Sequence, residues 1–218
     1  PMTLAERLIA YMALKGYEID RQPGQYNIIY VEGCDPDGRA NADRMDEWND
    51  MRYVVEFDAQ GVPQLVHSGI ATTEPGKRAT FDPAAARRGG VARVQFGQFR
   101  VWKMGFHKQG ILRYGHPALV QALPLLVYRD ALKRGIRQGA LLPAWGINQH
   151  STRLQYKGGP VANWSEGCLV EKDFESHLRF ISLCRADIRY QADKDYIFAS
   201  TIIAGDDLEK HFPLSLAA

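Results

Sequence analysis

A cysteine and a histidine in the C-terminal half of the chain are suited to nucleophilic chemistry. Cys168 ends the run Ser165-Glu166-Gly167-Cys168, and His150 lies 18 residues before it. A thiol is a strong nucleophile only as the thiolate, and a nearby imidazole is the usual group that takes its proton. We therefore interpret Cys168 as the nucleophile of an acyl transfer and His150 as its base.

The residues next to Cys168 predict how the reaction intermediate is held. Glycine lets the chain turn tightly, so the backbone N–H groups of Gly167 and Cys168 are the expected donors to an oxyanion. Ser165 is expected to support the site through its hydroxyl. His150 needs a partner that fixes its tautomer, and the sequence leaves a backbone carbonyl, Ser151 and Glu166 as alternatives.

Further residues are candidates for substrate binding. Trp164 and Asn163 are expected to line the cleft, and Arg153 to form a bidentate pair with a substrate carboxylate. His107 is expected to contact substrate rather than a metal. Glu166 and Ser151 are also candidates for substrate binding. The structural alternatives are core packing for Trp164, solvent exposure for Arg153 and Glu166, and packing of its segment on the core for His107.

Two stretches resemble the L,D-transpeptidase (YkuD-type) catalytic domain. That family carries a strand-borne His followed by a small residue, and then a Ser-His-Gly-Cys segment at about this distance. His150-Ser151 and residues 165–168 match this pattern. Residues 67–76, with the sequence HSGIATTEPG, resemble the family's Ser-Gly…Thr-Pro-x-Gly segment. The resemblance covers about residues 50–184, apart from a long insertion at about 85–140.

The resemblance implies both a reaction and departures from the family pattern. It implies attack on the carbonyl of a diamino acid that is linked to a terminal D-amino acid in a peptidoglycan stem peptide. Glu166 stands where the family usually has His, and Leu169 and Val170 follow the cysteine where the family often has Arg or Asn. Papain-like and NlpC/P60-like enzymes place the cysteine before the histidine, which is the reverse of the order here.

The elements that must position these residues are predicted from hydrophobic periodicity. A capping box of Thr3 and Glu6 begins a helix over 3–15, and a second helix is expected over 174–184. Strands are expected at 26–31, 51–57, 62–68, 93–102, 118–123, 125–130, 144–150 and 196–203. The prediction is one domain, 1–218, of the α+β class. Its mainly-β, L,D-transpeptidase-like core of β-sandwich type has an N-terminal extension, 1–50, and helices near the N-terminus and after the nucleophile.

Composition excludes several classes of protein. The chain has 218 residues, of which 45% are hydrophobic and 24% charged, and its net charge is +2. Such a charge gives no broad attraction to nucleic acid, and no run of 18 apolar residues predicts a membrane span. The sequence has neither paired Cys spacing nor a His pair at i, i+4, so we expect no metal site. Thiol acyl transfer needs no cofactor.

Three functions stay open at this point. The first is a transferase that cross-links stem peptides or exchanges D-amino acids. The second is a carboxypeptidase- or endopeptidase-type wall hydrolase or toxin, and the third is a non-catalytic envelope or phage module with a decayed site. The N-terminal residues lack the apolar core of a signal peptide. We expect a location in the periplasm or cell envelope with a leader absent from this sequence, or delivery by secretion or by a phage.

Overall fold

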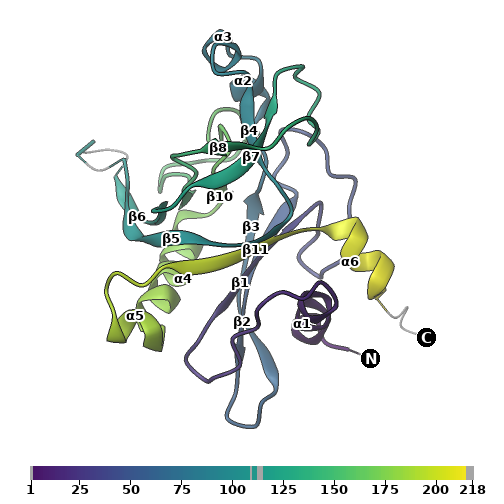
Figure 1. Ribbon diagram of the computed structural model, residues 1–218, viewed down its shortest axis with the longest axis vertical. Coiled ribbons are helices and arrows are strands. Elements are labelled where there is room, and N and C mark those ends of the chain that lie inside the picture. Colours follow the sequence, from purple (N-terminus) through teal and green to yellow (C-terminus); the bar gives the residue numbers. More distant parts are fainter. Residues whose placement is uncertain (1, 109, 112–114, 215–218) are drawn as a thin grey trace.

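Most strands belong to one mixed sheet that closes into a barrel (Figure 1). The structure is a computed structural model that describes residues 2–108, 110–111 and 115–214. In spatial order the barrel strands are β1 (Asn27–Glu32), β11 (Phe198–Ala204), β5 (Gly97–His107), β6 (His116–Gln121), β9 (Gln149–Ser151), β10 (Leu169–Glu171), β3 (Pro63–Thr72) and β2 (Asp50–Phe57). The β1–β11 and β9–β10 pairs are parallel, and the other pairs are antiparallel.

A smaller antiparallel sheet and several helices complete the fold. The smaller sheet has the order β4 (Val91–Val94), β7 (Leu125–Asp130) and β8 (Leu142–Ala144). The helices are α1 (Leu4–Leu14), α2 (Lys77–Thr80), α3 (Pro83–Ala86), α4 (Phe174–Ala186), α5 (Ile188–Ala192) and α6 (Gly205–His211). Figure 1 shows α1 and α6 beside each other and α4 with α5 on another side of the barrel. Within the described residues, no helix combines the length and the apolar composition needed to cross a membrane.

Both faces of β1 are buried, because side chains alternate along a strand. Ile28 and Tyr30 belong to one apolar cluster, which also contains Phe180 from α4. Ile29 and Val31 belong to a second cluster, which contains the apolar face of α1. The strand is therefore covered on one side by α4 and on the other by α1, which explains its continuous apolar sequence.

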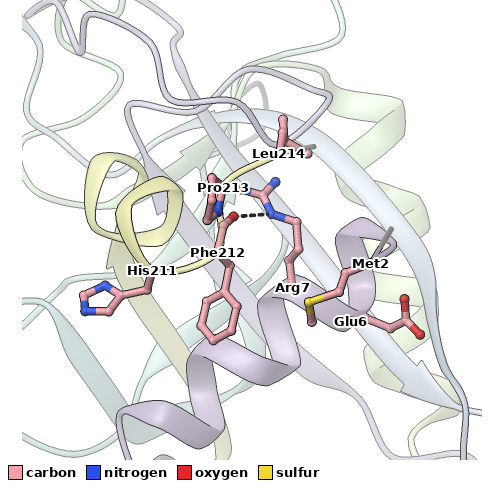
Figure 2. Close-up of a pocket in the computed structure, with 7 residues that line it drawn as sticks. All are labelled: Met2, Glu6, Arg7, His211, Phe212, Pro213 and Leu214. Carbon is pink, nitrogen blue, oxygen red and sulfur yellow. Dashed lines mark hydrogen bonds between the residues drawn. The ribbon is translucent and has the colours of Figure 1, made fainter. Parts of the chain in front are cut away.

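The predicted helix at the N-terminus is confirmed together with its capping box. The side chain of Thr3 accepts from the Glu6 N–H, and the side chain of Glu6 accepts from the Thr3 N–H. At the other end of the chain, Arg7 donates from Nε to the Phe212 carbonyl at 2.8 Å. Figure 2 shows this contact beside a cavity of about 580 Å³, where α1 meets the segment after α6.

The α+β class with a mainly-β core is confirmed, and the sandwich form is corrected to a closed barrel. The sheet closes because β1 pairs with both β2 and β11. The segments 1–50 and 85–140 are not peripheral to it. The first contributes β1, and the second contributes β5 and β6 to the barrel. Their description as an extension and an insertion relative to the family stays a prediction.

Two predicted strands are each divided into two. The strand expected over 93–102 is β4 in the small sheet and then β5 in the barrel, because the chain crosses between sheets at residues 95–96. The strand expected over 144–150 is β8 and then β9. Gly146 lies between them with a φ of 82°, which extended backbone does not adopt. The break leaves the Gly146 carbonyl facing the candidate nucleophile.

A buried ion pair holds the end of β10 inside the barrel. Arg52 on β2 pairs with Glu171 on β10, and both side chains have no exposed surface. Arg52 also donates to the Tyr30 hydroxyl at 3.1 Å and to Nδ1 of His177 at 3.3 Å, and it lies over the ring of Phe180. Burial lowers the pKa of His177 well below its usual value, with Arg52 as the next cause, so this histidine is a neutral acceptor.

We predict that Glu171→Gln lowers the free energy of unfolding by about 3–5 kcal/mol, because the Arg52 charge is then buried without its partner. Urea unfolding of the variant measures this loss.

The matched control is Glu166→Gln, which removes the carboxylate of the exposed Arg88–Glu166 pair and is expected to cost less than about 1 kcal/mol. The double variant Arg52→Met/Glu171→Leu removes both buried charges and should recover much of the loss. Equal stability of Glu171→Gln and Glu166→Gln would contradict the prediction.

Candidate active site at the start of β10

The candidate nucleophile lies on a turn that the Ser165 side chain holds. Ser165 Oγ accepts from the Gly167 N–H at 3.1 Å and donates to the Cys168 carbonyl at 2.8 Å. Gly167 has a φ of 133°, and a Cβ there would lie 2.7 Å from the Ala92 carbonyl oxygen. A larger residue is therefore excluded twice, by backbone conformation and by space. The Gly76 N–H donates to the Ser165 carbonyl at 3.1 Å, so the two family-like stretches are in contact.

One expected oxyanion donor is already engaged. The Gly167 N–H, which the sequence suggested for this role, donates to Ser165 Oγ. The Cys168 N–H donates to no acceptor in the described part of the chain. Of the two expected donors to an oxyanion, the Cys168 N–H is therefore the one left, because the Gly167 N–H bonds to Ser165.

The Cys168 thiol lies against the segment between β8 and β9. Sγ donates to the Gly146 carbonyl at 3.4 Å and accepts from the Asn148 N–H at 3.4 Å. Burial raises the pKa of Cys168 to about 11, although the Asn148 N–H acts in the opposite direction. At neutral pH the resting thiol therefore keeps its proton, and His150 does not hold it as a thiolate.

His150 is buried and its tautomer is fixed. Nδ1 lies 3.0 Å from the Ser151 carbonyl oxygen, which can only accept, so Nδ1 carries the proton and Nε2 has the free lone pair. The imidazole stacks on His107 with ring centroids 3.8 Å apart and planes 5° from parallel. Burial lowers the pKa of His150 well below its usual value, and His107 contributes. Of the alternatives for orienting His150, the Ser151 carbonyl is the one present.

Asn148 links the thiol to the stacked histidines, and the sequence analysis did not single it out. Its Oδ1 accepts from the Gln121 N–H at 3.0 Å, which turns its amide nitrogen toward Nδ1 of His107 at 3.2 Å. Burial lowers the pKa of His107 to about 4, so this ring is neutral as well. Its spacing could have indicated this role, because residues two positions apart along a strand share a face and Asn148 lies two residues before His150.

Cys168 and His150 reach the site on neighbouring parallel strands. Val170 is the register partner of His150, and the Leu169 N–H donates to the Asn148 carbonyl at 3.0 Å. Cys168 precedes Val170 by two residues, so it starts on the same face of the sheet as His150. Among the described residues, no hydrogen bond joins Sγ to the imidazole. Cys168 therefore lies two residues before the register partner of His150, and the two side chains are not hydrogen-bonded to each other.

The predicted site residues line two cavities. The first, about 220 Å³, contains Cys168 and Glu166. Arg88, Arg129 and Trp145 also line it, and the sequence analysis did not select them as site residues. The second, about 20 Å³, lies at His150. The predicted substrate-binding residues other than Glu166 line this second cavity, namely His107, Ser151, Arg153, Asn163 and Trp164. Ser165 and Gly167 line neither cavity.

Glu166 lies at the wall of the Cys168 cavity and does not contact His150. Its carboxylate pairs with Arg88 at 2.9 Å, and the two side chains are 60% and 55% exposed. Its backbone carbonyl accepts from the Ala92 N–H at 3.4 Å, which attaches the turn to the small sheet. Glu166 is thus a surface ion-pair partner at the cavity that holds the thiol.

Within the ranges that the structure describes, no group of three or more His, Cys, Asp or Glu side chains is placed to hold a metal ion. In the comparisons with known proteins, no protein family, no curated protein and no solved structure matches this chain.

We predict that Ser165→Ala lowers the free energy of unfolding by about 1–3 kcal/mol, because the buried Gly167 N–H and Cys168 carbonyl lose their partner. Urea unfolding measures the loss. Ser182→Ala is the matched control, since its exposed hydroxyl donates only to the Leu178 carbonyl within α4. The control should stay within about 0.5 kcal/mol of wild type. Equal effects of the two substitutions would show that the Ser165 hydroxyl does not hold the turn.

We also predict the pH dependence of alkylation at Cys168 by iodoacetamide. The thiolate reacts, and with a pKa of about 11 its fraction rises about tenfold per pH unit well below that value. The rate should therefore increase about 100-fold from pH 7 to pH 9 without a plateau. Peptide mass spectrometry assigns the label to Cys168. A rate that is already maximal near pH 7 would instead show a resting thiolate–imidazolium pair.

Proposed function

We propose that this chain is a cysteine acyl-transfer enzyme that acts on peptidoglycan stem peptides, with Cys168 as nucleophile and His150 as base. The observation that carries the proposal is the nucleophile turn itself. Its thiol opens into a cavity, and the adjacent strand supplies an imidazole whose Nδ1 is anchored and whose Nε2 is available. The substrate class comes from the resemblance to L,D-transpeptidases. The substrate places the protein in the periplasm or cell envelope, or among secreted or phage-delivered proteins.

The proposed reaction begins with the neutral thiol. As Sγ attacks the acyl carbonyl, its proton passes to Nε2 of His150, and the new oxyanion accepts from the Cys168 N–H. Collapse of this intermediate breaks the C–N bond, and His150 returns the proton to the leaving amine. The product is a thioester at Cys168. Because burial disfavours the charged imidazole, protonated His150 is a strong acid toward that amine.

The acceptor decides between the two enzymatic outcomes. An amine that attacks the thioester gives cross-linking or D-amino-acid exchange, and water gives carboxypeptidase cleavage. Incubation of a stem tetrapeptide with and without an acceptor amine distinguishes them. Products that are identical under both conditions would identify a hydrolase.

A non-catalytic binding module is the second candidate. It is favoured by one observation, which is that the resting thiol is protonated and bonds to the Gly146 carbonyl rather than to an imidazole. In that case, the turn and its cavity would bind a wall peptide without reacting.

We predict that a carbapenem, which acylates the nucleophile of the resembled family, forms a one-to-one adduct with the wild-type protein and none with Cys168→Ala. Intact-protein mass spectrometry measures the adduct. Cys34→Ala is the matched control, because Cys34 is a buried thiol in the cluster under α1 and should not affect acylation.

His150→Gln should slow adduct formation by a factor of about 10²–10⁴, the usual contribution of a general base. The absence of an adduct on folded wild-type protein would contradict the enzymatic proposal and favour the binding module.

A further inference from the structure

We infer that Arg129 binds the free carboxylate of the amino acid that leaves when Cys168 attacks the acyl donor. The inference rests on the proposed function and specifies its substrate, because it requires a donor that ends in a carboxylate directly after the cleaved bond.

The small sheet directs Arg129 toward the nucleophile turn. Arg129 on β7 is the register partner of Ala92 on β4. The methyl group of Ala92 faces Gly167, since a Cβ built on that glycine would lie 2.8 Å from it. Cross-strand partners project from the same face of a sheet, so the Arg129 side chain projects toward the turn as well. Arg129 and Cys168 accordingly line the same cavity.

The two arginines of this cavity differ in charge compensation. Arg88 is paired with Glu166. Arg129 is half-buried and has a hydrogen bond of 3.4 Å to the Gly90 carbonyl, and no carboxylate of the described residues lies within ion-pair distance of it. Burial, followed by the charge of Arg88, lowers the pKa of Arg129. The cavity that holds the nucleophile therefore has an uncompensated cation, which a bound anion would neutralise.

A carboxylate suits this cation better than other anionic groups of a peptide. The planar guanidinium presents parallel N–H donors that match the two oxygens of a carboxylate. In the proposed attack, the carboxylate belongs to the residue directly after the reacting carbonyl, so only the N and Cα atoms of the leaving residue separate the two carbons. The cavity of about 220 Å³ has room for one small amino-acid residue.

Arg129 keeps its positive charge throughout the proposed reaction step. The S–C bond forms at Cys168 and the peptide C–N bond breaks. The thiol proton moves through His150 to the leaving amine. The carboxylate stays ionised on Arg129 from binding to release, so this residue selects the donor and orients its carbonyl without exchanging a proton.

The test compares two stem tetrapeptide donors that differ only at the C-terminus, one a free carboxylate and the other a carboxamide. We expect wild-type kcat/KM to be about 10- to 100-fold higher for the acid, as a charged hydrogen-bonded pair provides. Arg129→Gln should lower kcat/KM for the acid to the level of the amide and leave the amide unchanged. Arg129→Lys should restore part of the preference, because it returns the charge without the fork.

Arg179→Gln is the matched control, since it removes an exposed arginine on α4 and should leave both donors unaffected. Urea unfolding of each variant verifies its fold. Equal turnover of the acid and the amide by wild type, or an equal loss for both in Arg129→Gln, would overturn the inference and leave the acyl-transfer function in place. Failure of wild type to turn over either donor would instead contradict the proposed function together with this inference.

Discussion

The buried ion pair of Arg52 and Glu171 is the interaction on which the placement of the candidate nucleophile, Cys168, depends. The strand β10 has three residues, too few for backbone pairing alone to fix its register. Glu171 ends this strand inside the barrel, and a slip of one residue would move its carboxylate out of reach of Arg52 and bring Val170 inward. The same register sets Val170 opposite His150. The ion pair at Glu171, three residues after Cys168, thereby determines which residues of β9 lie beside the candidate nucleophile.

Burial is the dominant electrostatic influence at the site. It raises the pKa of Cys168 and lowers the pKa of His150 and of His107, so all three groups rest in their neutral forms. Stacking reinforces this, because two protonated rings 3.8 Å apart would repel each other. A neutral site can store a reactive thiol without losing it to oxidation, since the thiolate is the form that oxidises readily. In the proposed reaction, proton transfer from Cys168 therefore accompanies attack on the substrate.

Local patterns in the sequence predicted local structure well. The capping box of Thr3 and Glu6 identifies α1, and a run rich in apolar and aromatic residues identifies β2, since both signals depend on neighbouring residues. The nucleophile turn was also recognisable, because Gly167 and Cys168 are adjacent in the chain. The Ser165 hydroxyl takes the Gly167 N–H that was assigned to the oxyanion, and no spacing rule indicates such competition. The role proposed for Arg129 has no signal in the local sequence, because it depends on a cross-strand partner in a separate sheet.

The identity of residue 166 connects the divergence of the motif with the charge of the cavity. Glu166 stands where the resembled family usually has histidine, and its carboxylate is one cause of the raised pKa of Cys168. It also neutralises Arg88, which leaves the Arg129 charge for a ligand. With a substrate carboxylate on Arg129, both arginines are compensated, and the oxyanion on the attacked carbonyl becomes the new negative charge in the cavity. In the proposed reaction, the oxyanion of the transition state is stabilised by the Cys168 N–H, which is the donor that the turn leaves unoccupied.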